Sequence, residues 1–170
     1  DVPFKERLHQ YIELQKYLIS KSSIDLRLNT EVTPEYAEAE KADAIIAAVG
    51  SVAASANIPG TEGANVYQAI DIFNDPAKAR GKVVILGAGF VGTELAIHLR
   101  QLGVRDVEVI EMLGSITDGG NDHHRQAIED MIEQYAIPIR FNTKAKEITS
   151  AGIRCDDPDG EVFFEADTVI

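Results

Sequence analysis

The sequence has few basic residues and only one cysteine, and each shortage excludes a class of protein. There are 16 Lys and Arg against 28 Asp and Glu, which gives a net charge of -12 over 170 residues. A charge of this sign repels phosphate backbones and anionic membrane surfaces, so we expect neither a nucleic acid nor a membrane as a partner. The single cysteine, Cys155, excludes an internal disulfide.

Long apolar runs are also lacking. No run approaches the roughly 18 residues that a membrane-spanning helix needs, although 45% of the residues are hydrophobic, which is ordinary for a globular protein. The chain opens at Asp1 without Met, a basic leader or a signal-peptide core. We therefore expect a soluble, cytoplasmic protein, of which this chain is a piece.

Two pairs of stretches repeat each other along the chain. LRLNTEV at 26–32 is similar to IRFNTKA at 139–145, and ADAII at 42–46 is similar to ADTVI at 166–170. Repetition in the same order is typical of a duplicated unit. The second unit begins with a strand, a glycine loop and a helix that the first one lacks. The pattern therefore predicts the back half of one dinucleotide fold followed by nearly all of a second.

Alternating strands and helices predict an α/β fold with a parallel sheet. Expected helices span 3–21, 90–102 and 121–135, and expected strands span 24–29, 43–49, 82–86, 106–111, 137–142 and 166–170. DPDG predicts a turn inside a small antiparallel hairpin insert at 146–165. Residues 50–79 are too long for a loop within a compact domain and are predicted to connect two domains, 1–79 and 80–170.

The clearest motif is VVILGAGFVGTELAIHL at 83–99, an apolar strand that runs into a glycine loop and a helix. Gly87, Gly89 and Gly92 have the spacing GxGxxG. The first glycine permits a tight turn, the second permits the backbone to approach a pyrophosphate, and the third permits close helix packing. Amides at the start of the helix then face the phosphates. In this context the motif predicts dinucleotide binding.

Glu111 ends the next predicted strand, 24 residues after Gly87. A carboxylate at this place accepts hydrogen bonds from ribose hydroxyls and repels a 2′-phosphate, and residues 112–115 supply no arginine to offset it. The sequence therefore favours NAD over NADP. A solvated glutamate at the end of a strand is the alternative interpretation of Glu111.

Other chemistry-bearing residues have plainer alternatives. Glu94 is interpreted either as a residue beside the nicotinamide or as one that only stabilises its helix. Phe90 is interpreted either as a cover for the pocket or as a core residue beneath the loop. The neighbours His123 and His124 point in different directions on a helix, so we expect no shared metal. Cys155 has no CxxC partner and is predicted to be a strand or hairpin residue without a redox role. We therefore predict no catalytic nucleophile and no general base, as in enzymes whose cofactors carry the chemistry.

The assembled pattern resembles the flavoproteins with two dinucleotide folds. The stretches at 4–18, 26–51 and 63–73 look like the carboxy-terminal part of the NADH:flavin oxidoreductases related to 2,4-dienoyl-CoA reductase, 2-enoate reductase and trimethylamine dehydrogenase. The similarity covers essentially the whole chain. It implies a fragment of a pyridine nucleotide-disulphide oxidoreductase fold, with a Rossmann-like sheet that follows an incomplete flavin-type dinucleotide fold.

The resemblance also implies cofactors and roles for particular residues. In that family a barrel carries FMN and an iron–sulfur cluster, and the carboxy-terminal part binds FAD and, in the reductases, a nicotinamide cofactor. The implied cofactor-binding positions here are the glycine loop and its helix, the ribose-binding acid and the turn that joins the two folds: Gly87, Ala88, Gly89, Phe90, Val91, Gly92, Glu94, Glu111, Met112, Ala48, Val49 and Gly50. Residues 51–57 lack the family's usual prolines, and only one glycine loop is present.

Two functions from different classes follow. The first is the nicotinamide-binding part of an NADH-dependent flavin oxidoreductase, which passes a hydride from NADH to FAD in the complete enzyme and is inactive alone. The second is a dinucleotide-binding module with a structural or regulatory role and no turnover. Expected partners are NADH, the flavin and barrel domains of the parent, and a second copy through the incomplete fold.

Overall fold

The structure is a computed structural model that describes residues 5–54, 56–116 and 122–170. The chain divides into two compact units, residues 1–52 and residues 53–170. No helix in the described ranges is both long and apolar enough to cross a membrane.

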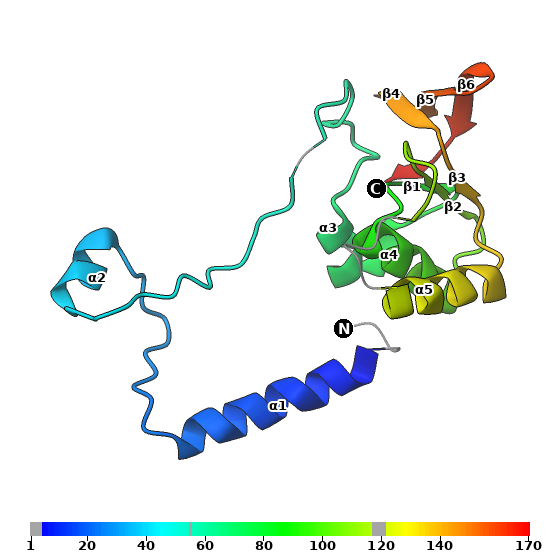
Figure 1. Ribbon diagram of the computed structural model, residues 1–170. Coiled ribbons are helices and arrows are strands. Elements are labelled where there is room, and N and C mark those ends of the chain that lie inside the picture. The colour runs from blue at the N-terminus through cyan, green and yellow to red at the C-terminus, as the bar shows by residue number, and fades with distance from the viewer. Residues whose placement is uncertain (1–4, 55, 117–121) are drawn as a thin grey trace. The chain divides into compact units, whose positions relative to one another are not determined.

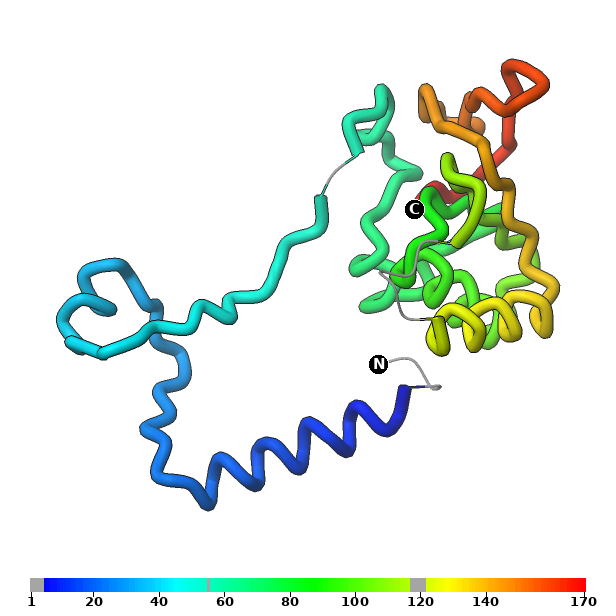
Figure 2. The backbone as a smooth tube through the Cα atoms, in the orientation of Figure 1, coloured from blue at the N-terminus to red at the C-terminus, as the bar shows by residue number. Residues whose placement is uncertain are grey.

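The described residues of the first unit form two α-helices. Helix α1 (Glu6–Lys21) confirms the helix predicted at 3–21, but none of its residues is buried. Helix α2 (Pro34–Ala39) was not predicted, although its start carries a clear signal: the Thr33 hydroxyl accepts a hydrogen bond from the Tyr36 amide, and a proline follows Thr33 directly. Residues 42–52 continue without a helix or a strand, as the tube in Figure 2 shows.

The strands predicted at 24–29 and 43–49 are wrong, because neither segment forms a strand. A strand needs the backbone groups of a neighbouring strand, and the described residues of this unit form two helices and no strand. Asn29 also has a φ of 55°, which is left-handed backbone. Asn142, at the matching place of the second repeat, has the same φ of 55°, although the residues before it form β3 (Ile139–Arg140).

The second unit is built on a parallel sheet in the order β3-β2-β1-β7. Its strands are β1 (Val83–Leu86), β2 (Val107–Ile110), β3 (Ile139–Arg140) and β7 (Thr168–Val169). Helix α4 (Phe90–Gln101) joins β1 to β2, and α5 (Asp122–Gln134) lies between β2 and β3. All six elements lie within segments predicted from the sequence, which confirms the α/β Rossmann-like fold class.

A second sheet is antiparallel and contains β4 (Lys144–Thr149), β5 (Gly152–Asp157) and β6 (Gly160–Glu165). The hairpin between β5 and β6 is the predicted one, and β4 adds a third strand that the hairpin prediction did not include. Buried residues of the two sheets, among them Val84, Val169, Ile153 and Cys155, share one apolar cluster. In Figure 1, α4 and α5 lie on one side of the parallel sheet and β4 to β6 on the other.

The predicted connector at 50–79 contains regular structure at its end. Helix α3 (Ala69–Asn74) has a capping box between Gln68 and Asp71, and the short 3₁₀ helix η2 (Pro76–Lys78) follows it. Val66 also forms a parallel bridge with Val169 of β7. The last part of this segment therefore packs with the parallel sheet.

Candidate functional site: the glycine loop and the carboxyl ends of the strands

The glycine loop leaves β1 at Leu86 and enters α4 at Phe90, and two of its glycines have requirements that only glycine meets. Gly87 has a φ of +106°, which side-chain-bearing residues rarely adopt. A Cβ atom on Gly92 would lie 2.0 Å from the carbonyl oxygen of Gly87. The helix therefore starts directly against the loop. Gly89 is the residue that precedes the helix, with an ordinary φ of -75°.

Glu111 reaches the loop from the end of β2. Its Oε2 accepts a hydrogen bond of 2.7 Å from the Ala88 amide, and its Oε1 accepts one of 2.8 Å from the Leu113 amide. Glu111 is only 6% exposed and Ala88 is fully buried. The carboxylate that the sequence places near a ribose therefore also fixes the backbone of the glycine loop. The spacing predicted that these residues lie together, but not that they bond to each other.

Backbone hydrogen bonds hold the ends of three strands at the same edge of the sheet. The Gly87 amide donates to the carbonyl of Ile110, and the Glu111 amide donates to the carbonyl of Arg140. The Glu111 carbonyl accepts from the Thr143 amide at 2.9 Å. Ligands of open parallel sheets bind beyond this edge, so the loop and Glu111 occupy the expected place.

A pocket of about 670 Å³ opens at this edge. It is lined by the ends of β1 and β2, by β4 and by the segment before β1: Ala56, Asn57, Ile58, Leu86, Gly87, Ile110, Glu111, Met112, Thr143, Lys144, Ala145 and Lys146. The lining is mostly apolar, with one carboxylate, one hydroxyl, one amide and two ammonium groups. Its composition suits a ligand with a flat apolar part and several polar groups.

The two lysines of this pocket were not singled out by sequence reasoning. They lie more than thirty residues beyond Glu111, and no local motif marks them; the fold alone brings them to the pocket. Lys146 is held by Asp156 at 3.1 Å and Glu161 at 3.2 Å, and these two carboxylates raise the pKa of its ammonium group. Lys144 is exposed on the same strand.

A second cluster of side chains lies at the amino-terminal part of α4, where Phe90 begins the helix and Glu94 follows one helical turn later. The ring centroid of Phe90 lies 4.1 Å from that of His124, in the first turn of α5. The Nε2 atom of His124 lies 3.3 Å from Oε1 of Glu94, whose side chain is 11% exposed. The sequence analysis considered His124 only for a shared metal, which it did not expect, whereas the structure places His124 against both Phe90 and Glu94. The structure leaves His123 exposed.

Other predicted site residues lie further from the loop or outside the core. Val91, one of the implied cofactor-binding positions, is 59% exposed, and Leu102 at the other end of α4 is 54% exposed. The buried run of the helix spans residues 92–99, which excludes both ends. Met112 is 61% exposed and lines the pocket.

Ala48, Val49 and Gly50 lie in the first unit, outside any helix or strand. Val49 is 93% exposed, and Gly50 has a φ of +76° that suits glycine. Their predicted role at a junction with a flavin fold stays a prediction. Among the described residues, no group of three or more His, Cys, Asp or Glu side chains could hold a metal ion.

Cys155 is a strand residue of β5, as predicted, and is fully buried. Burial raises the pKa of its thiol to about 11. A thiol with so high a pKa is almost entirely protonated at neutral pH and is a poor nucleophile. Burial likewise lowers the pKa of His98, which stacks on Phe73 at 6.0 Å between centroids.

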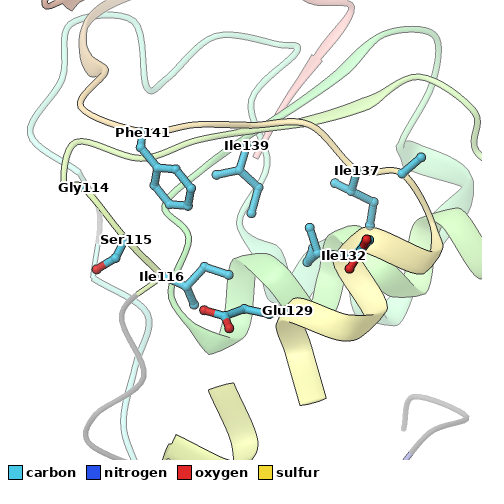
Figure 3. Close-up of a pocket in the computed structure, with 10 residues that line it drawn as sticks. Gly114, Ser115, Ile116, Glu129, Ile132, Ile137, Ile139 and Phe141 are labelled. Carbon is cyan, nitrogen blue, oxygen red and sulfur yellow. The ribbon is translucent and has the colours of Figure 1, made fainter. Parts of the chain in front are cut away.

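A separate pocket of about 570 Å³ lies between α5, β3 and residues 114–116. Figure 3 shows Ile116, Ile132, Ile139 and Phe141 around this hollow, with Glu129 at its side. It shares no lining residue with the pocket at the glycine loop. The backbone amides and polar groups that a dinucleotide needs gather at the loop instead.

The parallel sheet with its glycine loop and strand-end acid defines a dinucleotide-binding fold of the Rossmann type. The chain belongs to the pyridine nucleotide-disulphide oxidoreductase family, whose family model matches residues 7–170. The family prediction made from the sequence is confirmed at this level.

Two of the curated relatives are named reductases. Bilirubin reductase of Mediterraneibacter gnavus is 27% identical over 168 residues, which cover 99% of this chain and 26% of that protein. Cinnamate reductase of Clostridium sporogenes is 25% identical over 98% of this chain and 25% of its own length. The chain therefore spans about a quarter of the length of these relatives.

Solved structures of two reductases have a similar fold. A 2-naphthoyl-CoA reductase in complex with 2-naphthoyl-CoA aligns with a TM-score of 0.84 at 26% identity, over 99% of this chain and 26% of that one. A thioredoxin reductase of T. acidophilum aligns with a TM-score of 0.60 at 22% identity, over 71% of this chain and 40% of that one, and supports the fold alone. The chain is a pyridine nucleotide-binding oxidoreductase module by family.

Proposed function

We propose that this chain binds NADH in a flavin oxidoreductase of the kind related to 2,4-dienoyl-CoA reductase, and presents the nicotinamide to FAD held by the complete enzyme. The observation that carries the proposal is the bond between Glu111 and the glycine loop, beside the pocket at the strand ends. It joins the two parts of the dinucleotide motif in one rigid element. The reductases named among the relatives support a redox parent.

The residues present fit a dinucleotide. The backbone contact between Gly87 and Gly92 would be blocked by any side chain on Gly92, so this close approach is built into the sequence. It brings the amino end of α4 against the loop, where the helix dipole favours a pyrophosphate. NADH would supply a hydride and FAD would accept it, whereas the protein binds and orients. FMN and an iron–sulfur cluster belong to the parent in this proposal.

NADH is the preferred nucleotide in this proposal because Glu111 lies where an adenosine ribose would bind. Its carboxylate has lone pairs left after accepting the two backbone bonds, and these can accept from ribose hydroxyls. A 2′-phosphate at the same place would meet a negative charge. Lys144 acts against this preference for NADH, since its ammonium group belongs to the same pocket and would attract a 2′-phosphate.

Titration calorimetry of the chain with NADH and NADPH tests the proposal. We expect Glu111→Gln to weaken NADH binding by about 1 to 3 kcal/mol, the scale of lost charge-assisted hydrogen bonds. The same variant should reduce the difference in affinity between NADH and NADPH. Glu108→Gln is the matched control, because Glu108 is also a buried glutamate of β2 but pairs with Arg140 at 2.7 Å. Equal or tighter binding of NADPH by the unaltered chain would contradict the role of Glu111.

The smaller difference in affinity between NADH and NADPH is the result that decides this test. Glu111→Gln also disturbs the bonds to Ala88 and Leu113, and a disturbed loop would weaken both nucleotides alike. Removal of the charge alone favours NADPH relative to NADH. A parallel loss for both nucleotides would show that Glu111 acts only through the loop.

A module without turnover is supported by the same carboxylate. Both oxygens of Glu111 serve the protein backbone, which is what a purely structural glycine turn would require. The complete parent protein distinguishes the two functions. Anaerobic addition of NADH should bleach its flavin if the module delivers a hydride, and should leave the flavin oxidised if the module is structural or regulatory.

A further inference from the structure

We propose that His124 is a positioning residue for the nicotinamide end of the bound dinucleotide, acting through Phe90 and Glu94. This inference rests on the proposed function and names a residue of the same site. Phe90 and Glu94 belong to α4, whereas His124 comes from the first turn of α5, thirty residues further along the chain. The cluster exists only because the fold packs the two helices together.

His124 makes a different contact with each of its two neighbours. Its ring lies against that of Phe90 at 4.1 Å between centroids and an interplanar angle of 41°. Its Nε2 atom lies 3.3 Å from Oε1 of Glu94. One imidazole thus restrains both an aromatic ring and a carboxylate that stand one helical turn apart on α4.

The positions of Phe90 and Glu94 on α4 link the cluster to the ligand. The pocket beside Glu111 takes one half of a dinucleotide, and the amino end of α4 takes the pyrophosphate. The second half must then continue past the amino-terminal end of α4. Phe90 begins this helix and Glu94 lies one helical turn further along it, and neither residue lines the pocket at Glu111. We therefore place them beside the nicotinamide, where the carboxylate can accept from the carboxamide N–H groups.

Restraint by His124 is needed for a fixed nicotinamide site, because the side chains of Phe90 and Glu94 would otherwise have other rotamers available. An aromatic ring at the mouth of a site can cover or open it, and a mostly buried carboxylate needs a polar neighbour. A fixed carboxylate and a fixed ring select one orientation of the nicotinamide. The prediction is specific for the second half of the ligand, because the contacts at Glu111 do not involve His124.

The test compares NADH with ADP-ribose, which has the adenosine and pyrophosphate but lacks the nicotinamide. We expect His124→Ala to weaken NADH binding about three- to tenfold, which corresponds to one or two lost contacts of ordinary strength, and to leave the affinity for ADP-ribose within about twofold. Nicotinamide fluorescence of bound NADH should shift toward that of free NADH. His123→Ala is the matched control, because this neighbouring histidine is exposed.

Two conservative variants separate the two contacts. His124→Phe keeps an aromatic ring against Phe90, and His124→Gln keeps a polar group for Glu94. Each should restore part of the selectivity for NADH over ADP-ribose that His124→Ala loses. They also keep the test valid if His124→Ala does not fold.

Equal losses for NADH and ADP-ribose would overturn the inference, since His124 would then support only the general structure. Unchanged binding of both ligands, as for His123→Ala, would overturn it as well. In both cases the proposed function stands, because the unaltered chain still binds NADH. If the unaltered chain binds neither ligand, the proposed function fails and this inference fails with it.

Discussion

Replacing Gly92 with alanine should destabilise the second unit and remove dinucleotide binding. The new Cβ would lie 2.0 Å from the carbonyl oxygen of Gly87 and 3.2 Å from its carbonyl carbon. Ordinary contact begins near 3.4 Å, so the loop and the helix would have to separate by about 1.4 Å. Both obstructing atoms belong to the backbone and cannot rotate away.

The expected magnitude follows from two opposing effects. Alanine is normally better than glycine inside a helix by about 0.5 to 1 kcal/mol. Forcing extra atoms into a packed site usually costs about 1 to 3 kcal/mol. We therefore expect a net loss of about 1 to 2 kcal/mol in the free energy of unfolding, measured by urea denaturation. NADH affinity should fall by at least roughly tenfold, because amides that bind a ligand must be held to within about 0.5 Å.

Gly103→Ala is the control for this prediction. Gly103 follows the other end of α4, with a φ of +91° and nothing within 4 Å of the new Cβ. This change should destabilise the fold through backbone strain alone, by about 1 kcal/mol, and leave NADH binding intact. If Gly92→Ala were as stable as the unaltered chain and bound NADH equally well, the close approach of loop and helix would be refuted.

Three further predictions concern the rest of the chain. Burial raises the pKa of the Cys155 thiol from 9.0 to about 11, so the stability that the buried thiol contributes is present below pH 9 and is lost as the pH rises toward 11. Alkylation of Cys155 in the folded chain should therefore stay slow until the pH approaches 11, and fast labelling near pH 9 would contradict this. The purified chain should be colourless, since it contains one glycine loop and that loop is assigned to NADH; stoichiometric yellow flavin would be the contrary result. Hydrogen exchange should find residues 82–111 better protected than residues 1–49, where Leu8, Tyr11 and Ile46 are exposed; uniform protection in a monomer would disprove it.

The elements around the glycine loop could be predicted because their signals are local. An apolar strand, a GxGxxG spacing and an apolar helix stand in one run of 17 residues, and the acid after the next strand has the usual offset. The structure places Glu111 against the loop, in agreement with that offset. Spacing alone did not reveal that the carboxylate bonds to Ala88, since this depends on side-chain direction.

The strands at 24–29 and 43–49 show where local signals fail. Their residues have strand-like patterns, but a strand forms only against a neighbour that supplies backbone groups. Strand β4 shows the opposite error, because KAKEIT is too polar to be read as a strand and is stabilised by its pairing with β5. Tertiary context decided both outcomes.

Lys144 and His124 reach the site through long-range packing. Lys144 lines the pocket because β4 borders the pocket at the strand ends of the parallel sheet. His124 contacts Glu94 because α5 packs on α4. Neither residue has a motif of its own in the sequence. Contacts of this kind depend on the tertiary fold and leave no local signal in the sequence.

Backbone amide chemical shifts, recorded by NMR as NADH is added, locate the dinucleotide on the chain. We predict the largest changes at Gly87 to Gly92 and at Glu111 to Leu113, with residues 132–141 around the apolar pocket of Figure 3 unaffected. Saturable changes that gather at residues 132–141, with the glycine loop unchanged, would contradict the claim that this loop holds the dinucleotide.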